Sequence, residues 1–180
     1  VNTIADGTAV KTPGEKIFPY IQKNLDDIIT VDDDELVVAF LDMVENHKMV
    51  IENSGLLTVA ALKHLNVKEK RVVSILSGGN MDVITMSSVV QQGLIFRDRI
   101  FTVSVLLPDK PGELSRVADT IAKEQGNVIK LEHNQFVSIN RSAAVELRIT
   151  LEAFGTDHKK QIMKALEKNG YKPKLVRTNL

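Results

Sequence analysis

The regular alternation of apolar and polar residues after residue 100 constrains the fold of this chain more than any other feature. Phe101–Leu107 and Val145–Leu151 carry an apolar side chain at every second position, which predicts two strands that each bury one face. Between them, Glu113–Gln125 carry apolar side chains at helical spacing, and Gly126 follows, as is common after a helix C-terminus. The pattern predicts a sheet that is covered by helices.

The whole segment predicts the order strand, helix, strand, strand, helix, strand. The other three elements are expected over Val128–Phe136, Asp157–Asn169 and Lys174–Arg177. This is the order of the ferredoxin-like split βαβ unit, βαββαβ. Because its helices cover one face of the sheet only, the other face and the strand edges are open to pairing with a second copy.

The first hundred residues predict helices of a different arrangement. Asp32–Glu35 precede an apolar stripe over residues 36–44, and the acidic side chains suit a capping box at a helix start better than a metal site. Further helices are expected over residues 13–24, after Asn53-Ser54-Gly55, and over residues 82–92. These helices alternate with apolar runs, as in an α/β domain.

Two apolar runs of this half, Ile28–Val31 and Val72–Leu76, are continuous and rich in β-branched residues. Strands that are buried on both faces of a parallel sheet have this composition. Two strands do not make a stable open sheet, so residues 1–96 are expected to be part of a larger α/β domain that is repacked or completed by another chain. A polar break at Phe96–Arg99 separates them from a second predicted domain over residues 100–180.

Composition excludes several classes of function. Lys and Arg number 23, as do Asp and Glu, and aromatic residues make up 4%, so the chain has neither the basic field nor the stacking platforms of nucleic-acid-binding proteins. No apolar run is long enough to span a membrane. The absence of Cys removes disulfides and Cys-based zinc sites, and a cytoplasmic location is expected.

The histidines predict no metal site. They are His47, His64, His133 and His158. No two have the spacing of helical metal ligands, and no Ser-His-Asp set can be argued. We expect His47, His64 and His158 on helix surfaces, and His133 on a strand.

A glycine-rich turn, Ser77-Gly78-Gly79-Asn80, follows the second predicted buried strand. Its glycines would let a ligand approach the backbone at the carboxyl end of a strand, where α/β proteins bind ligands. Taken alone, the segment is equally compatible with a plain tight turn.

Three blocks of the first half, in this order, resemble the C-terminal part of the catalytic domain of the pyridoxal-phosphate-dependent serine/threonine dehydratases. They are Thr3–Lys11, Val50–Gly55 and Val73–Asn80. The resemblance implies a partial domain of the tryptophan-synthase β type. It also implies that Ser77 hydrogen-bonds the pyridine nitrogen of the cofactor, a neutral contact that suits β-elimination.

The same resemblance implies further contacts to cofactor and substrate. Gly78 and Gly79 would line the ring, and Glu52 would lie close to its edge. Asp6 and Gly7, with Ala5, would lie near the substrate. Simpler alternatives stay open, because Asp6-Gly7 is also an ordinary turn signal and Glu52 also suits a helix N-terminus.

The resemblance also implies that two cofactor-binding motifs of the family are absent from this chain. The family holds pyridoxal phosphate by a Schiff-base lysine in a Ser-Phe-Lys-type motif and by a separate glycine-rich phosphate loop, and neither motif occurs in these 180 residues. The complete enzyme would convert L-threonine to 2-oxobutanoate and ammonia. We expect this fragment to contain no catalytic residue, to bind no pyridoxal phosphate and to be inactive.

In the second half, Leu107-Pro-Asp-Lys-Pro-Gly-Glu-Leu lies at the first junction of strand and helix, and within the βαββαβ order it resembles an ACT domain. The free amides of a helix start favour a carboxylate. The resemblance implies an amino-acid effector, such as isoleucine or valine, held between paired domains. One copy would supply Gly112, Glu113 and Leu114, and its partner Asn127, Val128 and Ile129.

Alternatives to this interpretation stay open. Many ACT-like domains bind nothing and only dimerise, so self-association as a homodimer or a higher oligomer is predicted more firmly than the effector. The chain is also compatible with a stand-alone amino-acid-binding module that has an α/β appendage. Within the enzyme family, a relative that dehydrates or racemises serine is the alternative, and the predicted regulatory domain favours threonine, from which branched-chain products descend.

Overall fold

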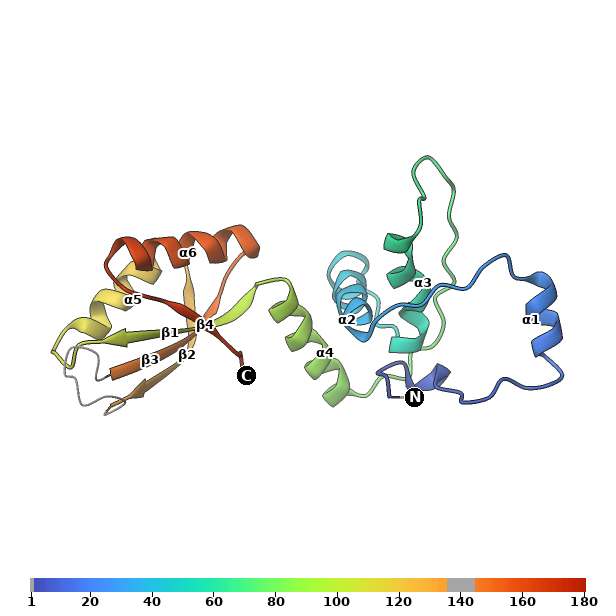
Figure 1. The fold of residues 1–180 in the computed structure, drawn as a ribbon, viewed down its shortest axis with the longest axis horizontal. Helices are drawn as coiled ribbons and strands as arrows, with labels where there is room; N and C mark the ends of the chain where they lie inside the picture. Colours follow the sequence, from blue (N-terminus) through green and yellow to red (C-terminus); the bar gives the residue numbers. More distant parts are fainter. Residues whose placement is uncertain (1, 136–144) are drawn as a thin grey trace. The chain divides into compact units, whose positions relative to one another are not determined.

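The computed structural model describes residues 2–135 and 145–180 (Figure 1). It divides into two compact units, Val1–Gly93 and Leu94–Leu180. The division falls shortly before the predicted break at Phe96–Arg99. The assignment of residues 1–96 and 100–180 to two functional domains stays a prediction.

The second unit is a four-stranded antiparallel sheet with two helices on one face (Figure 1). In chain order its elements are β1 (Ile100–Leu107), α5 (Glu113–Lys123), β2 (Asn127–Asn134), β3 (Val145–Glu152), α6 (Thr156–Lys168) and β4 (Lys174–Val176). The strands lie in the order β2-β3-β1-β4, and β1 pairs with β3 over its whole length. The predicted ACT-like βαββαβ order is therefore confirmed. The predicted end of the second strand, Phe136, lies outside the described residues.

The core of this unit lies between the sheet and the two helices. Its most buried apolar side chains, none more than 1% exposed, are Val103, Val105, Leu107, Val117, Ile121, Leu147, Ile149, Leu151, Ile162 and Leu166. They occupy alternate positions of β1 and β3 and one stripe of each helix, as the apolar periodicity predicts. Each such burial stabilises the folded chain by about 1.5–3 kcal/mol relative to exposure of the same side chain.

The face of the sheet without helices is more buried than predicted. Thr102 and Thr150 are 6% and 3% exposed, and their hydroxyl oxygens form a hydrogen bond of 2.9 Å. Val176 in β4 and Lys130 in β2 pair with these two residues at opposite edges of the sheet. Since the Lys130 ammonium donates to the carbonyl oxygen of Asn179 at 3.4 Å, the residues after β4 cross this face. The expectation of half-buried strands was wrong for the centre of the sheet.

The corner between β3 and α6 corrects the prediction that His158 is a surface residue. The Phe154 amide donates to His158 Nδ1 at 3.0 Å, and His158 Nε2 lies 2.6 Å from the carbonyl oxygen of Glu124. These partners assign the ring proton to Nε2. The His158 side chain therefore joins the start of α6 to the end of α5.

The first unit is built from short helices. They are η1 (Asp6–Thr8), α1 (Phe18–Asn24), α2 (Asp33–Asp42), η2 (Met43–His47), η3 (Asn53–Leu56), α3 (Leu57–Ala60), η4 (Ala61–His64) and α4 (Val83–Phe96). The predicted helices are present, with shifted ends. The first begins at Phe18 because Pro13 and Gly14 precede it in an irregular stretch, and the last extends to Phe96. Leu36, Phe40 and Leu56, each at most 1% exposed, lie at the centre of its core.

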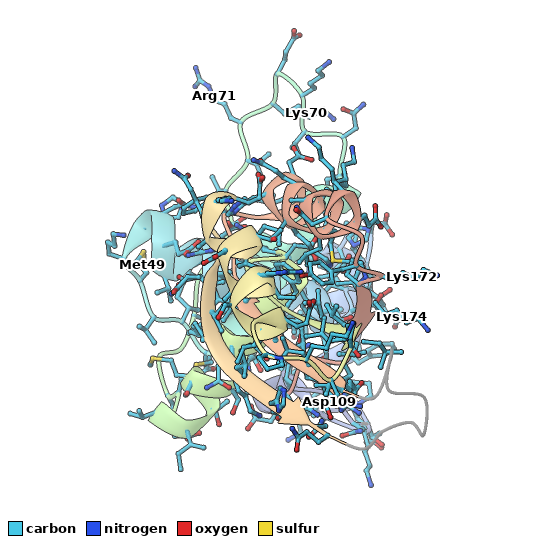
Figure 2. The ribbon with its side chains drawn as sticks, turned by 90° about the vertical axis from the view of Figure 1, so that its left-hand side faces the viewer. Met49, Lys70, Arg71, Asp109, Lys172 and Lys174 are labelled. Atoms are coloured by element: carbon cyan, nitrogen blue, oxygen red, sulfur yellow. The ribbon has the colours of Figure 1, made fainter. Side chains whose placement is uncertain are left out.

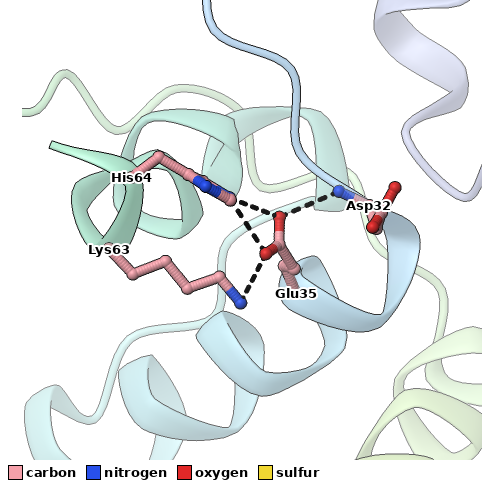
Figure 3. A network of polar contacts seen from close by, with 4 residues as sticks. All are labelled: Asp32, Glu35, Lys63 and His64. Atoms are coloured by element: carbon pink, nitrogen blue, oxygen red, sulfur yellow. Dashed lines mark hydrogen bonds and ion pairs between the residues drawn. The ribbon is translucent and has the colours of Figure 1, made fainter.

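The predicted capping box at the start of α2 is present and has two further partners (Figure 3). Glu35 accepts the amide of Asp32 at 2.9 Å, the ammonium of Lys63 at 2.6 Å and Nε2 of His64 at 2.9 Å. His64 is exposed on η4, as predicted, and its ring also contacts this carboxylate. These contacts join the start of α2 to η4. The hydrogen bond from Lys63, followed by that from His64, lowers the pKa of Glu35 from 4.5 to about 2.

The two predicted buried strands of this unit are the main error of the sequence analysis. Ile28–Val31 and Val72–Leu76 are irregular, and no strand is formed within residues 2–93. Ile28, Val73 and Ile75 are 72%, 90% and 74% exposed. The described part of this unit offers these segments no neighbouring strand, and an isolated strand leaves its backbone groups without partners.

The depressed pKa of Glu35 predicts a pH-dependent stability of the first unit. A carboxyl group whose pKa is lower in the folded state stabilises that state above its unfolded pKa and loses this effect as the pH falls through the folded value. Glu35→Gln should therefore lower the urea midpoint of the first unit at pH 7, and the difference from the unaltered chain should shrink between about pH 4.5 and pH 2. Asp34→Asn removes the same charge from an exposed position of the same turn and should have a smaller effect. Equal effects of the two variants at pH 7 would contradict this account.

Candidate functional site

The structure brings together residues from the three blocks of the first unit that the sequence analysis singled out. The amide of Glu52 donates to the carbonyl oxygen of Gly78 at 3.3 Å, and the amide of Asn80 donates to the Glu52 carboxylate at 3.2 Å. A Cβ atom at Gly7 would lie 3.0 Å from Ser54 Oγ and 3.6 Å from Glu52 Oε1. The segment around Gly7 therefore meets, at the carboxylate of Glu52, two segments that follow it in the sequence by some fifty and seventy residues.

Gly78 adopts a left-handed conformation, with a φ of +78° that favours glycine. A Cβ atom there would lie 2.1 Å from the carboxyl carbon of Glu52, so the carboxylate fills the space that a side chain would need. Gly79 differs, because a Cβ atom there would meet nothing within 4 Å. The turn is closed against Glu52 on the side of Gly78 and open at Gly79.

Gly55 fixes the same turn from the other side, and the sequence analysis missed this role. A Cβ atom at Gly55 would lie 1.7 Å from the carbonyl oxygen of Ser77, so only glycine allows the backbone of Ser77 to approach this closely. The signal was present in the block Val50–Gly55, whose last residue is a glycine that lies within η3. The side chain of Ser77 is left exposed.

Asp6 lies at the start of η1 and is exposed. Its carboxylate accepts the amide of Gly7 at 2.8 Å, which is a local contact of the kind made in turns. Ala5, beside it, is buried in the core of this unit. The roles of Asp6 and Gly7 near a substrate stay predictions.

Two buried polar atoms next to the cluster lack a partner among the described residues. They are Asn53 Oδ1 and Ser54 Oγ. Asn53 is 6% exposed, and its amide nitrogen donates to the carbonyl oxygen of Ile4 at 3.0 Å, which leaves the oxygen unused. An unsatisfied buried polar atom costs about 1–3 kcal/mol.

These residues fit one edge of a planar cofactor. The open space at Gly79, the exposed hydroxyl of Ser77 and the closed backbone around Gly78 allow a flat ring to lie against the turn. The remaining requirements of pyridoxal phosphate, a Ser-Phe-Lys-type lysine motif and a glycine-rich phosphate loop, do not occur in the sequence.

In the second unit, the predicted effector residues lie in two places. Gly112 has a φ of +90° and precedes α5, which begins at Glu113. Asn127 begins β2 and pairs with Glu152, which in turn pairs with Ile100 at the start of β1. Since Gly112 follows the end of β1, the two sets lie at opposite ends of the sheet and do not meet within one chain.

The predicted partner segment is accessible along its length. All eight residues of β2 are exposed, and Val128 and Ile129 are 37% and 44% exposed. The side chain of Asn127 donates to the Glu152 carboxylate at 3.1 Å. His133 is also exposed on this strand. Among residues 2–135 and 145–180, no three His, Cys, Asp or Glu side chains are grouped as metal ligands, and no helix combines the length and apolar character needed to cross a membrane.

The sequence of this chain is similar to those of known proteins. Residues 1–78 match the family model described as pyridoxal-phosphate dependent enzyme. An L-threonine ammonia-lyase of Geobacter sulfurreducens is 35% identical over 171 residues, which cover 94% of this chain and 42% of the relative. An L-threonine ammonia-lyase of Thermotoga maritima is 32% identical over 175 residues, which cover 97% of this chain and 44% of the relative.

The chain is a homologue of the threonine ammonia-lyases. It spans less than half the length of these two relatives. The sequence similarity to these relatives extends over both units, because it covers more than nine tenths of the chain. Among solved structures, prephenate dehydratase from Streptococcus mutans matches with a TM-score of 0.37 and 21% identity, covering 42% of this chain and 40% of that one, a likeness too weak to carry an argument.

The contact between Glu52 and Gly78 predicts that alanine at Gly78 destabilises the turn, whereas alanine at Gly79 does not. Gly78→Ala places a methyl group on the Glu52 carboxylate and strains a left-handed residue, which should cost about 1–2 kcal/mol and release the turn. Gly79→Ala enters open space and should be tolerated. The readout is the amide NMR signal of Asn80, which is bonded to Glu52, together with its hydrogen-exchange rate. Similar shifts in both variants would show that Glu52 does not hold the turn.

Proposed function

We propose that this chain is the C-terminal portion of a pyridoxal-phosphate-dependent threonine ammonia-lyase. In this proposal the first unit contributes one wall of the catalytic site, and the second unit is an ACT regulatory domain. The observation that carries it is the convergence of Gly7, Glu52 and Gly78 around a turn that is open at Gly79, next to buried polar atoms without partners. Its homology to threonine ammonia-lyases, over nearly the whole chain, supports the same conclusion.

The exposed apolar segments support the view that the catalytic domain is incomplete. Val73 and Ile75 have the β-branched character of buried strand residues and yet are 90% and 74% exposed. Ser77 follows them directly, so strand pairing along Val72–Leu76 would also fix the turn. In the proposed enzyme, the neighbouring strands come from the part of the protein that the two relatives have and this chain does not cover.

Each residue of the partial site has a definite task in the proposed enzyme. The Ser77 hydroxyl holds the pyridine nitrogen by a neutral hydrogen bond, and Gly78 and Gly79 keep side chains away from the ring. Glu52 holds the turn by accepting the amide of Asn80. Bound pyridoxal phosphate supplies the electron-accepting ring that stabilises the charge left when the substrate loses its α-proton. Asp6 and Gly7 lie where the substrate would enter.

The chain by itself is proposed to be inactive. Elimination needs a base at the α-carbon and an anchor for the cofactor phosphate, and the sequence contains neither the lysine motif nor the glycine-rich loop that serve these purposes in the family. An isolated hydroxyl and two glycines hold only one edge of the ring. Ammonia-lyase activity is therefore proposed for the whole protein only.

Regulation is proposed to require a second copy. Gly112, Glu113 and Leu114 lie at the opposite end of the sheet from Asn127, Val128 and Ile129, so both sets reach one amino acid only if two domains pair. The exposed edge strand β2 is suited to such pairing, because no strand within residues 2–135 and 145–180 pairs with its outer backbone groups. Isoleucine or valine is the proposed effector, and a pair that binds no amino acid is the alternative.

The decisive experiment uses the complete reading frame that contains this segment. The purified product should consume L-threonine faster than L-serine, release 2-oxobutanoate and ammonia, and change its rate when isoleucine or valine is added. Ser77→Ala should lower kcat by about 10- to 100-fold through loss of one hydrogen bond to the ring, whereas Ser74→Ala, in the same segment, should not.

The 180-residue chain alone should show no absorbance band of lysine-bound pyridoxal phosphate. A stoichiometric band in this chain would contradict the proposal that it is only part of the site. Preference of the complete protein for serine, or racemisation of serine, would favour the related enzymes of the same family. Absence of any reaction with either amino acid would favour a stand-alone binding module.

A further inference from the structure

A cavity of about 980 Å³ lies at the β4 edge of the second unit, next to the loop between β1 and α5. It is lined by α5, the end of β1, the connection between α6 and β4, and β4 itself. It shares only Glu113 with the predicted effector residues. Because β2 and β4 form opposite edges of the sheet, a ligand here does not touch Asn127–Ile129 of the same chain.

The acidic side chains of this cavity are largely neutralised. Glu113 accepts from Arg116 at 3.2 Å. Glu146 accepts from Arg148 at 3.1 Å and from the hydroxyl of Ser104 at 2.7 Å, contacts that also lower its pKa. These carboxylates therefore contribute little free negative charge to the cavity.

Three cationic side chains of the cavity have no such partner. The ammonium groups of Lys123, Lys172 and Lys174 have no hydrogen-bond or ion-pair partner among the described residues, and the cavity contains one other carboxylate without a side-chain cation partner among them, that of Asp119. Lys172 and Lys174 project from the same edge of the unit (Figure 2). With two of the three cations uncompensated, the cavity carries a positive surplus that attracts an anion.

Apolar groups lie beside these cations. Leu106, although it belongs to the central strand β1, is 50% exposed at this place. Pro108, Val176 and the ring of Tyr171 line the same space. A cavity that combines an apolar wall with a few convergent charges is typical of sites for small organic molecules, and its volume lies within their usual range.

We propose that this cavity binds a small organic anion that carries two negative charges next to an apolar group. The charges would lie against Lys172 and Lys174, with Lys123 opposite, and the apolar part against Leu106. Flexible lysines suit this task, because each presents a compact charge on a mobile stem and does not demand one fixed geometry. This site goes beyond the proposed amino-acid effector and does not depend on it.

Phenyl phosphate is a suitable probe, because it joins a dianion to an apolar ring. Added at millimolar concentration to the 180-residue chain, it should shift the amide NMR signals of residues 169–176 in a saturable way. Phenol and inorganic phosphate, which each carry one half of the probe, should bind more weakly. Phenylsuccinate in a parallel titration distinguishes a dicarboxylate from a phosphate ester as the preferred anion.

The double variant Lys172→Gln, Lys174→Gln should weaken the binding of phenyl phosphate by about tenfold or more, since two charge-assisted contacts are lost. The matched control, Lys164→Gln with Lys168→Gln, removes the same charge from α6 outside this cavity and should leave the affinity unchanged. All four lysines are at the surface, so neither variant should unfold the sheet.

Three results would overturn the proposal. They are the absence of saturable shifts at residues 169–176, an equal loss of affinity in the two double variants, and shifts confined to Gly112 and Asn127–Ile129. The last would assign the anion to the predicted effector site. Failure of isoleucine and valine to bind is a separate result, because it concerns residues at other positions of the sheet.

Discussion

The two halves of this chain differ in whether their extended segments form backbone hydrogen bonds with a neighbouring strand. In the second unit, β1 pairs with β3 over eight residues, and the buried threonine pair Thr102 and Thr150 lies at the centre of the sheet. In the first unit, Ile28–Val31 and Val72–Leu76 have the side chains of strands and no strand to pair with among the described residues. The central strands of one half therefore meet their backbone requirements within the sheet, and the other half is held by helix packing and by polar contacts such as those of Glu35.

In the proposed enzyme, this difference explains why the candidate site is only partial. The turn at Ser77–Asn80 follows directly after an unpaired segment, and it is held by Glu52 and by the close approach of Gly55. Those contacts define the turn, and beside it the oxygen atoms Asn53 Oδ1 and Ser54 Oγ have no hydrogen-bond partner among the described residues. A homologue that spans less than half of its threonine ammonia-lyase relatives is expected to have one wall of the site without the opposite one.

Much of the second unit could be predicted from sequence because its signals are local. Alternation within β1 and β3 and the apolar stripes of α5 and α6 report directly on burial against one core. What could not be predicted depends on contacts distant in sequence: the coverage of Thr102 by residues after β4, and the bridge that His158 makes to Glu124. A single histidine on a helix carries no local sign of such a partner.

In the first unit, local sequence signals did not predict the structure of the extended segments. The composition of Val72–Leu76 is typical of a buried strand. A strand exists only where a neighbour accepts its hydrogen bonds, and the sequence of the segment does not say whether that neighbour is present. The convergence of Gly7, Glu52 and Gly78 followed from three blocks that resemble a known family. The role of Gly55 became visible only from the distance to the Ser77 carbonyl.

Hydrogen exchange of the backbone amides of Val72–Leu76 tests the central claim most directly. If the first unit is an incomplete domain, these amides should exchange at nearly the rate of an unstructured peptide in the 180-residue chain, while those of β1 and β3 are protected, and they should become protected in the complete protein. Protection in the 180-residue chain that matches that of β1 would show a self-sufficient fold and would contradict the account.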